Sequence, residues 1–159
     1  MIYKFHFDFD WVKLKPVCEE LINIEKSQMN LVNNGKTSYV NDIHPHNIDE
    51  FKPFFKLLTF TLNTHLFNST HFIGNSWVNV HHSGGKTIEH NHPNVDTVAA
   101  AYLHMPENGG YFEYKENLKW KEIPTISGDV LIFPGITNHR TQINKSSEDR
   151  WVLTTNLII

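Results

Sequence analysis

The chain has 159 residues, 40% of them aliphatic, aromatic or cysteine, which suits one globular domain over residues 1–159 with its own core. Its formal net charge is −3 and its basic residues are scattered, which argues against a surface for nucleic acid. The single cysteine, Cys18, excludes a disulfide within the chain, and no apolar run approaches the about 20 residues of a membrane span, so we expect a cytoplasmic protein that binds no membrane.

The first part of the chain, residues 1–69, is predicted to be mainly helical. Residues 10–28 carry apolar side chains at helical spacing, and residues 47–67 do the same with a stripe of phenylalanine and leucine. Residues 29–46 are polar and contain the turn signal "NNGK", so we expect a loop there.

Residues 70–159 change to short β-branched and aromatic runs separated by glycine and proline, a pattern typical of strands. The predicted strands cover residues 71–81, 86–91, 97–104, 110–115, 129–134, 138–143 and 150–158. Helices followed by strands indicate an α+β chain. Its body would be a β-sandwich or small barrel, with the N-terminal helices packed on one sheet.

Eleven histidines are unusual for this length, and two of them, His90 and His92, stand one residue apart in "EHNH". Residues two apart in a strand share a face, so both imidazoles would point to the same side. His139, at the start of a later strand, is the candidate third ligand, and Asp96 is a possible carboxylate ligand. Three protein ligands leave positions on a metal ion open for a substrate or oxygen.

Seven other histidines lack such partners and are interpreted as structural or surface residues: His6, His44, His46, His65, His71, His81 and His82. Among them, His81 and His82 are adjacent, so at most one can face inward.

Two long segments resemble the iron(II)- and 2-oxoglutarate-dependent oxygenases: "SWVNVHHSGGKTIEHNHPNVDTVAAAYLHMPENGGYFEY" and "ISGDVLIFPGITNHRTQINKSSEDRWVLTTNL". They are most similar to a small bacterial and phage branch of that superfamily. That branch has a histidine-x-histidine-proline run, a strand ending in "FP", a late histidine and a "DR" pair. The resemblance covers residues 76–157.

The resemblance implies a double-stranded β-helix, or jelly roll, similar to that of cupins, with a metal inside one end. It implies iron(II) bound by His90 and His139, and 2-oxoglutarate as cosubstrate with its far carboxylate on Arg150. Tyr102 falls where prolyl hydroxylases place a tyrosine that helps to bind the same carboxylate. Independently, a guanidinium matches a carboxylate bidentately and stays charged when buried. The alternative for Arg150 is an ordinary ion pair with Asp149 or another acid.

Two asparagines on predicted strands are weaker candidates. Asn79 and Asn156 could each turn an amide inward and bind the cosubstrate or another ligand.

His92 departs from the superfamily pattern, in which a carboxylate stands two residues after the first histidine. Three arrangements are open: His92 completes a three-histidine site, Asp96 restores the carboxylate, or His92 supports the ligands while water fills the position. A three-histidine site would carry one more positive charge, which should alter the preference among metals.

The segments "GGKTIEHNHPNVD" and "GDVLIFPGITNH" also resemble the two cupin motifs. That resemblance implies a cosubstrate-independent dioxygenase or an isomerase with the same fold and four ligands: His90, His92, Asp96 and His139. A jelly-roll module without activity is a third possibility.

Arg150 and Tyr102 favour the oxygenase among these alternatives. We therefore expect an Fe(II)- and 2-oxoglutarate-dependent dioxygenase, a hydroxylase that uses O2 and acts on a small molecule or on a protein side chain.

Overall fold

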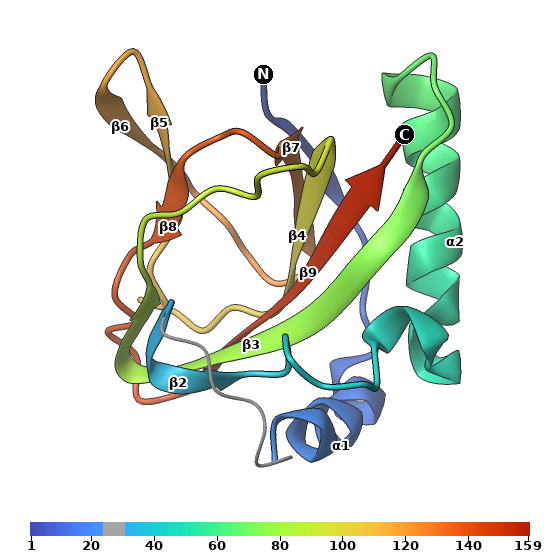
Figure 1. The fold of residues 1–159 in the computed structure, drawn as a ribbon. Helices are drawn as coiled ribbons and strands as arrows, with labels where there is room; N and C mark the ends of the chain where they lie inside the picture. The colour runs from blue at the N-terminus through green and yellow to red at the C-terminus, as the bar shows by residue number, and fades with distance from the viewer. Residues whose placement is uncertain (24–30) are drawn as a thin grey trace.

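Two antiparallel β-sheets face each other, and two helices lie outside the larger sheet (Figure 1). The computed structural model describes residues 1–23 and 31–159. The larger sheet has six strands in the order β1 (Tyr3–His6), β7 (Asp129–Pro134), β4 (Thr97–His104), β9 (Arg150–Ile158), β3 (Phe72–Thr87) and β2 (Val32–Thr37). The smaller sheet has three, in the order β6 (Lys119–Ile123), β5 (Phe112–Glu116) and β8 (His139–Thr141).

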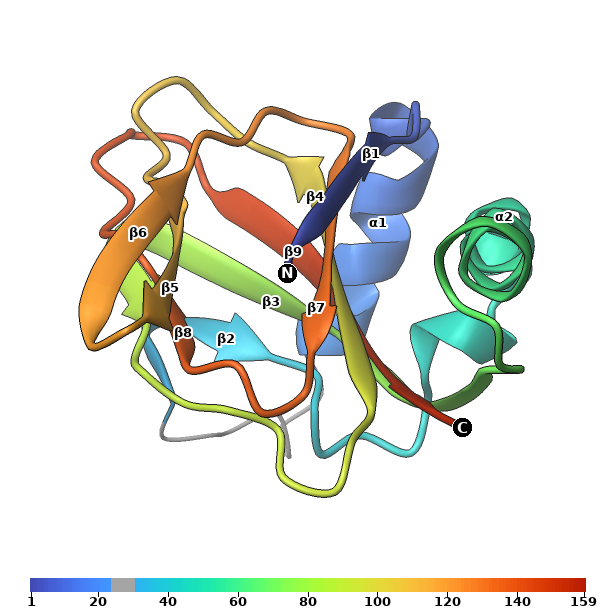
Figure 2. The same ribbon diagram turned by 90° about the horizontal axis from the view of Figure 1, so that it is seen from above.

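The helices cover the outer face of the larger sheet, opposite the smaller sheet, as Figure 2 shows from above. Helix α1 (Trp11–Ile22) begins after Asp10, whose carboxylate accepts a hydrogen bond from the third helical N–H. Helix α2 (Lys52–Thr61) follows two short 3-10 turns, Pro45–Asn47 and Asp49–Phe51, and continues into a π-helical turn, Leu62–Leu66. No helix in the described part of the chain is long and apolar enough to cross a membrane.

The strands of the larger sheet divide their side chains between two apolar clusters. In β4, Ala100 and Tyr102 belong to the cluster between the sheets, whereas Ala101 and Leu103 belong to the cluster shared with the helices. This follows from the alternation of side chains along a strand. Because apolar side chains cover both faces of β4, its sequence is an almost continuous apolar run.

The sequence predicted three strands with their observed bounds, namely residues 97–104, 129–134 and 150–158. The strands expected at 110–115 and 138–143 are present as β5 and the shorter β8. Strands β1 and β6 were not predicted.

The helix expected over residues 10–28 is present as α1, and residues 24–28 of that prediction lie outside the described residues. The helix expected over residues 47–67 is present as α2 with its flanking turns. Residues 29 and 30 of the loop expected over residues 29–46 lie outside the described residues. That loop prediction is wrong at β2, which pairs along β3. Gly35 permits this pairing, because a Cβ there would lie 2.1 Å from a carbonyl oxygen of β3.

The two strands expected at residues 71–81 and 86–91 are wrong as separate elements. Residues 72–87 form one strand, β3, in which the "SGG" makes no turn, and residues 88–91 lie beyond its end. Instead β2 pairs with β3 on both sides of the "SGG", at residues 79–81 and 86–87, and a shift of register between Asn33 and Gly35 leaves the "SGG" region as an irregularity. Gly84 there has a φ of +83°, a conformation that glycine adopts readily.

Substitution of Phe54, on the inner side of α2, tests how the helices are held. Its side chain is 2% exposed and its ring contacts those of Phe7 and Phe9. We expect Phe54→Ala to lower the free energy of unfolding by about 3–5 kcal/mol, because a large buried ring leaves a cavity. Phe60→Ala on the same helix, at a 55% exposed position, should change it by no more than about 0.5 kcal/mol. Denaturant unfolding measures both, and equal effects would contradict this packing.

Candidate metal centre and its cavity

His90 and His139 face each other across a short antiparallel bridge between the loop after β3 and the start of β8. The backbone N–H of each residue donates to the carbonyl oxygen of the other at 3.0 Å. Residues directly opposite in such a bridge carry their side chains on the same face. The two imidazole rings therefore converge, with centroids 4.3 Å apart.

His92 joins them from the same loop, but for a reason other than the predicted one. The strand expected over residues 86–91 ends at Thr87, so strand periodicity does not place His90 and His92 on one face. Instead the N–H of His92 donates to the carbonyl oxygen of Gly135 at 2.8 Å. Only glycine fits at position 135, since a Cβ there would lie 2.0 Å from the backbone oxygen of Val95.

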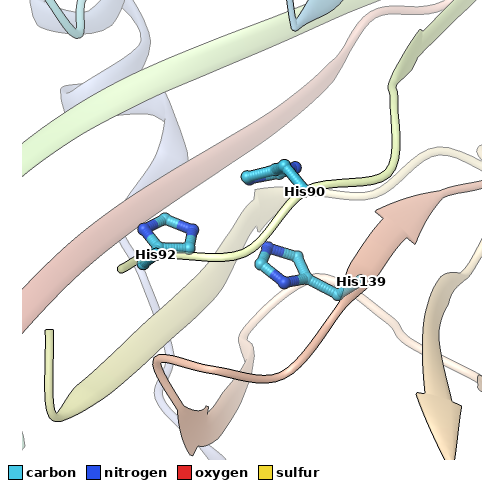
Figure 3. Close-up of side chains that lie close together, drawn as sticks. All are labelled: His90, His92 and His139. Atoms are coloured by element: carbon cyan, nitrogen blue, oxygen red, sulfur yellow. The ribbon is translucent and has the colours of Figure 1, made fainter. Parts of the chain in front are cut away.

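The three histidines form a compact cluster with one ligand atom from each (Figure 3). These atoms of His90, His92 and His139 all lie within 4.8 Å of one another. Among the described residues, this is the one group of three or more histidine, cysteine or acidic side chains close enough to share a metal ion.

Hydrogen bonds fix the form of two of these rings. Nδ1 of His90 lies 2.8 Å from the carbonyl oxygen of Ile88, and Nδ1 of His139 lies 2.8 Å from that of Thr137. A carbonyl oxygen can only accept, so each Nδ1 carries the hydrogen and each Nε2 keeps its lone pair. In His92, Nε2 is buried and has no hydrogen-bond partner. These lone pairs and this unpartnered nitrogen fit a divalent transition metal.

Burial keeps the three imidazoles neutral. It lowers the pKa of His139 to about 3 and that of His92 to about 4, and proximity to His90 adds to both effects. Burial also lowers the pKa of His90. Neutral imidazole is the form that binds metal, so the cluster is ready to do so at neutral pH.

A cavity of about 350 Å³ opens beside the cluster, between the two sheets. Its wall includes the three histidines together with polar residues of the sheets, among them Asn79, His81, Thr87, Tyr102, Thr141 and Asn156. The amide oxygens of Asn79 and Asn156 are buried and have no hydrogen-bond partner. A buried acceptor without a partner is costly, so these amides suit a bound ligand with donor groups.

Arg150, at the start of β9, has a fully buried side chain behind this cavity. It lies opposite His81 in the β3–β9 ladder, and its Nε donates to Nδ1 of His81 at 3.2 Å. Its other acceptors are one hydroxyl, Thr141 Oγ1 at 2.9 Å, and three carbonyl oxygens, those of Gly109, Gly110 and Gln142. Gly110 has a φ of +82°, and a Cβ there would lie 2.6 Å from the carbonyl oxygen of Ile143 and 2.9 Å from Nη1 of Arg150, so the position suits only glycine.

The charge of Arg150 has no counter-charge among the described residues. All of its hydrogen-bond partners are neutral, and Asp149, the alternative partner suggested by the sequence, pairs with His82 at 2.9 Å. Burial lowers the pKa of Arg150 to about 10, so the group remains protonated at neutral pH. A buried charge without a partner is unfavourable, which makes this end of the cavity suited to an anion.

The remaining predicted site residues divide between the cavity and the surface. Tyr102 lines the cavity, and burial raises its pKa to about 12, so the phenol is protonated. Asp96 is exposed, and its Oδ2 accepts a hydrogen bond from the N–H of Ile159 at 2.8 Å. It does not lie with the three histidines, so the four-ligand cupin arrangement is not assembled.

Three polar residues of this site were not predicted from the sequence. His81 was interpreted as structural, and Thr87 and Thr141 carried no signal that separates them from other threonines on strands. His81 is 1% exposed and faces inward, whereas the adjacent His82 is partly exposed. The cross-strand register places His81 opposite Arg150, and this register is visible only in the fold.

No protein-family model matches the sequence, and a search of curated proteins finds no match either. Solved structures match well. A viral collagen prolyl hydroxylase from Paramecium bursaria chlorella virus-1, in complex with 2-oxoglutarate, is 15% identical and has a TM-score of 0.70 over 98% of this chain and 94% of that chain. HygX from Streptomyces hygroscopicus, with nickel, 2-oxoglutarate and hygromycin B bound, is 12% identical, with a TM-score of 0.71 over 98% of this chain and 82% of that one.

A third match is an oxidoreductase of the 2OG-Fe(II) oxygenase family from Burkholderia pseudomallei, at 15% identity and a TM-score of 0.59. The match covers 70% of this chain and only 57% of that protein. At such low identities the likeness concerns the fold. The chain has the double-stranded β-helix of 2-oxoglutarate oxygenases, and the resemblance noted in its sequence is confirmed at this level.

The lowered pKa values predict how the metal-free protein responds to acid. Its imidazoles bind protons below pH 6.5 when unfolded but only near pH 3 to 4 at His92 and His139 when folded. The unfolded state therefore binds more protons in this window, and stability should fall as the pH drops from about 6.5 to 3. Melting temperatures measured by circular dichroism should decrease less steeply in His139→Gln than in the wild type. An identical slope in the two proteins would contradict the assignment.

Proposed function

We propose that this protein is an iron(II)- and 2-oxoglutarate-dependent oxygenase that acts as a hydroxylase. The observation that carries the proposal is a single cavity with three neutral histidines in its wall and an uncompensated buried cation behind it. Its fold, shared with 2-oxoglutarate oxygenases, supports the same conclusion.

His90, His92 and His139 are the proposed metal ligands, through the cluster of nitrogen atoms that lie within 4.8 Å of one another. The carbonyl oxygens on Nδ1 of His90 and His139 would hold these rings in orientation and make their Nε2 atoms better donors. Asp96 is occupied by the backbone of Ile159, so we propose a three-histidine site without a protein carboxylate.

When iron and 2-oxoglutarate are bound, they supply oxidative decarboxylation with O2, which yields succinate and carbon dioxide and hydroxylates the substrate. The protein's own residues bind and orient. Arg150 supplies positive charge from behind the cavity wall, and Tyr102, which is part of that wall, offers a phenol hydrogen. Asn79 and Asn156 offer amides to the cosubstrate or substrate.

The primary substrate is a small molecule or a protein side chain. The similar structures include a collagen prolyl hydroxylase and an enzyme with hygromycin B bound, so the fold serves both kinds. A cavity of about 350 Å³ is at the lower end of the roughly 300–1,000 Å³ of ligand pockets, and the cosubstrate would take part of it. Only a small group of the substrate would therefore enter.

Cys18 is free and buried, in keeping with the cytoplasm.

Metal binding is the first test of this proposal. Calorimetric titration of the metal-free protein with nickel, as a stable substitute for iron(II), should give one equivalent bound. His139→Ala should weaken binding by at least about 100-fold, since even the loss of a partner of a ligand costs about 10- to 100-fold. His65→Ala, at an exposed position in the π-helical turn after α2 and outside the histidine cluster, serves as the control and should bind as the wild type does. Equal affinities of the two variants would exclude His139 as a ligand.

Response to 2-oxoglutarate is the second test, and it separates an oxygenase from a cupin-type metalloprotein. A ligand that binds only the folded state raises the melting temperature. With nickel present, 2-oxoglutarate should raise the wild-type melting temperature further, and Arg150→Ala should lose this additional increase. The effect of nickel alone should persist in Arg150→Ala, which shows that the variant is folded. A wild type that responds to metal but not to 2-oxoglutarate would favour the cupin alternative.

A further inference from the structure

The buried Arg150 does not itself line the cavity, so its influence on a ligand must pass through the residues between them. Two of its hydrogen-bond partners, His81 and Thr141, do line the cavity, as does Thr87, the partner of His81. The guanidinium of Arg150 can only donate, and this fixes the direction of each hydrogen bond that follows from it.

The first path runs from Arg150 through His81 to Thr87. A guanidinium can only donate, so Nδ1 of His81 must be the acceptor of the bond from Nε. Burial and the charge of Arg150 hold the pKa of His81 well below its usual range, so the ring carries one hydrogen, and that hydrogen is on Nε2. Nε2 then donates to Thr87 Oγ1 at 2.7 Å, which leaves the hydroxyl hydrogen of Thr87 free to point elsewhere.

The second path runs from Arg150 directly to Thr141. Thr141 Oγ1 accepts from Nη2 of Arg150 at 2.9 Å and from the backbone N–H of Thr87 at 2.8 Å. With two donors on its oxygen, Thr141 can only donate with its own hydrogen. In the described part of the chain, neither threonine hydroxyl has an acceptor for that hydrogen.

We propose that the hydrogen bonds that begin at the buried Arg150 orient the hydroxyl groups of Thr87 and Thr141 as two donors, and that these donors bind the far carboxylate of the cosubstrate. In this arrangement His81 is a positioning residue that links Arg150 to Thr87 and sets the direction of its hydroxyl. The inference rests on the proposed function, because 2-oxoglutarate is the anion that the donors would serve.

The Gly109–Gly110 turn completes the arrangement. Its two carbonyl oxygens accept from Nη1 of Arg150 and hold the guanidinium against the far side of the cavity wall. The guanidinium thus donates to carbonyl oxygens on one side and to the Thr141 hydroxyl and the His81 imidazole on the other. Its orientation is fixed before any ligand arrives, which reduces the cost of ordering at binding.

Matched substitutions test the two hydroxyls by calorimetry with nickel bound, which requires no turnover. The probes are 2-oxoglutarate and 2-oxovalerate, which has the same chain length but lacks the far carboxylate. Thr87→Val and Thr141→Val should each weaken 2-oxoglutarate binding about ten-fold, the loss expected for a hydrogen bond to a charged group. Binding of nickel and of 2-oxovalerate should stay within about two-fold, which also shows that the variants fold. Thr87→Ser and Thr141→Ser keep the hydroxyl and should retain wild-type affinity.

Substitutions of His81 test the path itself. His81→Gln keeps one acceptor and one donor and should retain much of the 2-oxoglutarate affinity, whereas His81→Leu should weaken it as Thr87→Val does. The double variant His81→Leu/Thr87→Val should be no weaker than either single variant, because residues that act in one path are not additive.

The outcomes for the wild type and for the variants separate the two claims. If the wild type binds 2-oxoglutarate and Thr87→Val and Thr141→Val bind it equally well, the hydroxyl donors are refuted while the proposed function stands. The same holds if the valine variants lose affinity for 2-oxovalerate to the same extent, since the loss would then be general. If the wild type itself does not bind 2-oxoglutarate, both the proposed function and this inference fail.

Discussion

The alternation of side chains along a strand is the constraint on which this molecule depends. Every central strand of the larger sheet packs against the apolar helices on one face and lines, on the other, a space that holds both an apolar cluster and the cavity with its polar groups. In β9, Trp151 and Leu153 pack toward the helices, whereas Arg150, Val152 and Thr154 point between the sheets. Stability and chemistry are thereby carried by neighbouring residues of the same segment. A shift of one residue in register would exchange the two faces, so the long β3–β9 ladder protects the site as well as the fold.

The same ladder explains how a charge can be kept in the interior. Arg150 and His81 are directly opposite across it, so their meeting is a consequence of register alone. Neutral acceptors around the guanidinium lower the cost of burial but leave the positive charge in place. A protein that needed Arg150 only for packing would be more stable with an apolar side chain there, because buried charges are commonly less stabilising than well-packed apolar groups. The arginine at position 150 is better explained by a positive charge that attracts an anionic ligand.

The sequence predicted a strand correctly where the strand's own residues form an apolar run. It failed where a segment becomes a strand only by pairing with another strand. The uninterrupted apolar runs of β4, β7 and β9 were enough to give their bounds. Strand β2, "VNNGKT", has almost no apolar residues and forms only because it pairs with β3, so the sequence favoured a loop. The site shows the same division. His90, His92 and His139 do come together, but His92 is placed by a hydrogen bond to Gly135 rather than by strand periodicity. The surroundings of Arg150 depend on cross-strand register, which local sequence does not contain.

A cluster of three neutral imidazoles has an electrostatic consequence that connects the two ends of the cavity. A carboxylate ligand would cancel part of the charge of a divalent ion, whereas His92 in that position cancels none. The metal end and the Arg150 end would then both be positive, in a cavity whose described wall offers no acidic side chain. An anion with a negative group at each end is the ligand that such a cavity stabilises most, because each group meets an uncompensated charge in a medium that screens it weakly. The replacement of a carboxylate by histidine thus need not weaken the binding of a dicarboxylate, and it makes that binding more dependent on charge at both ends.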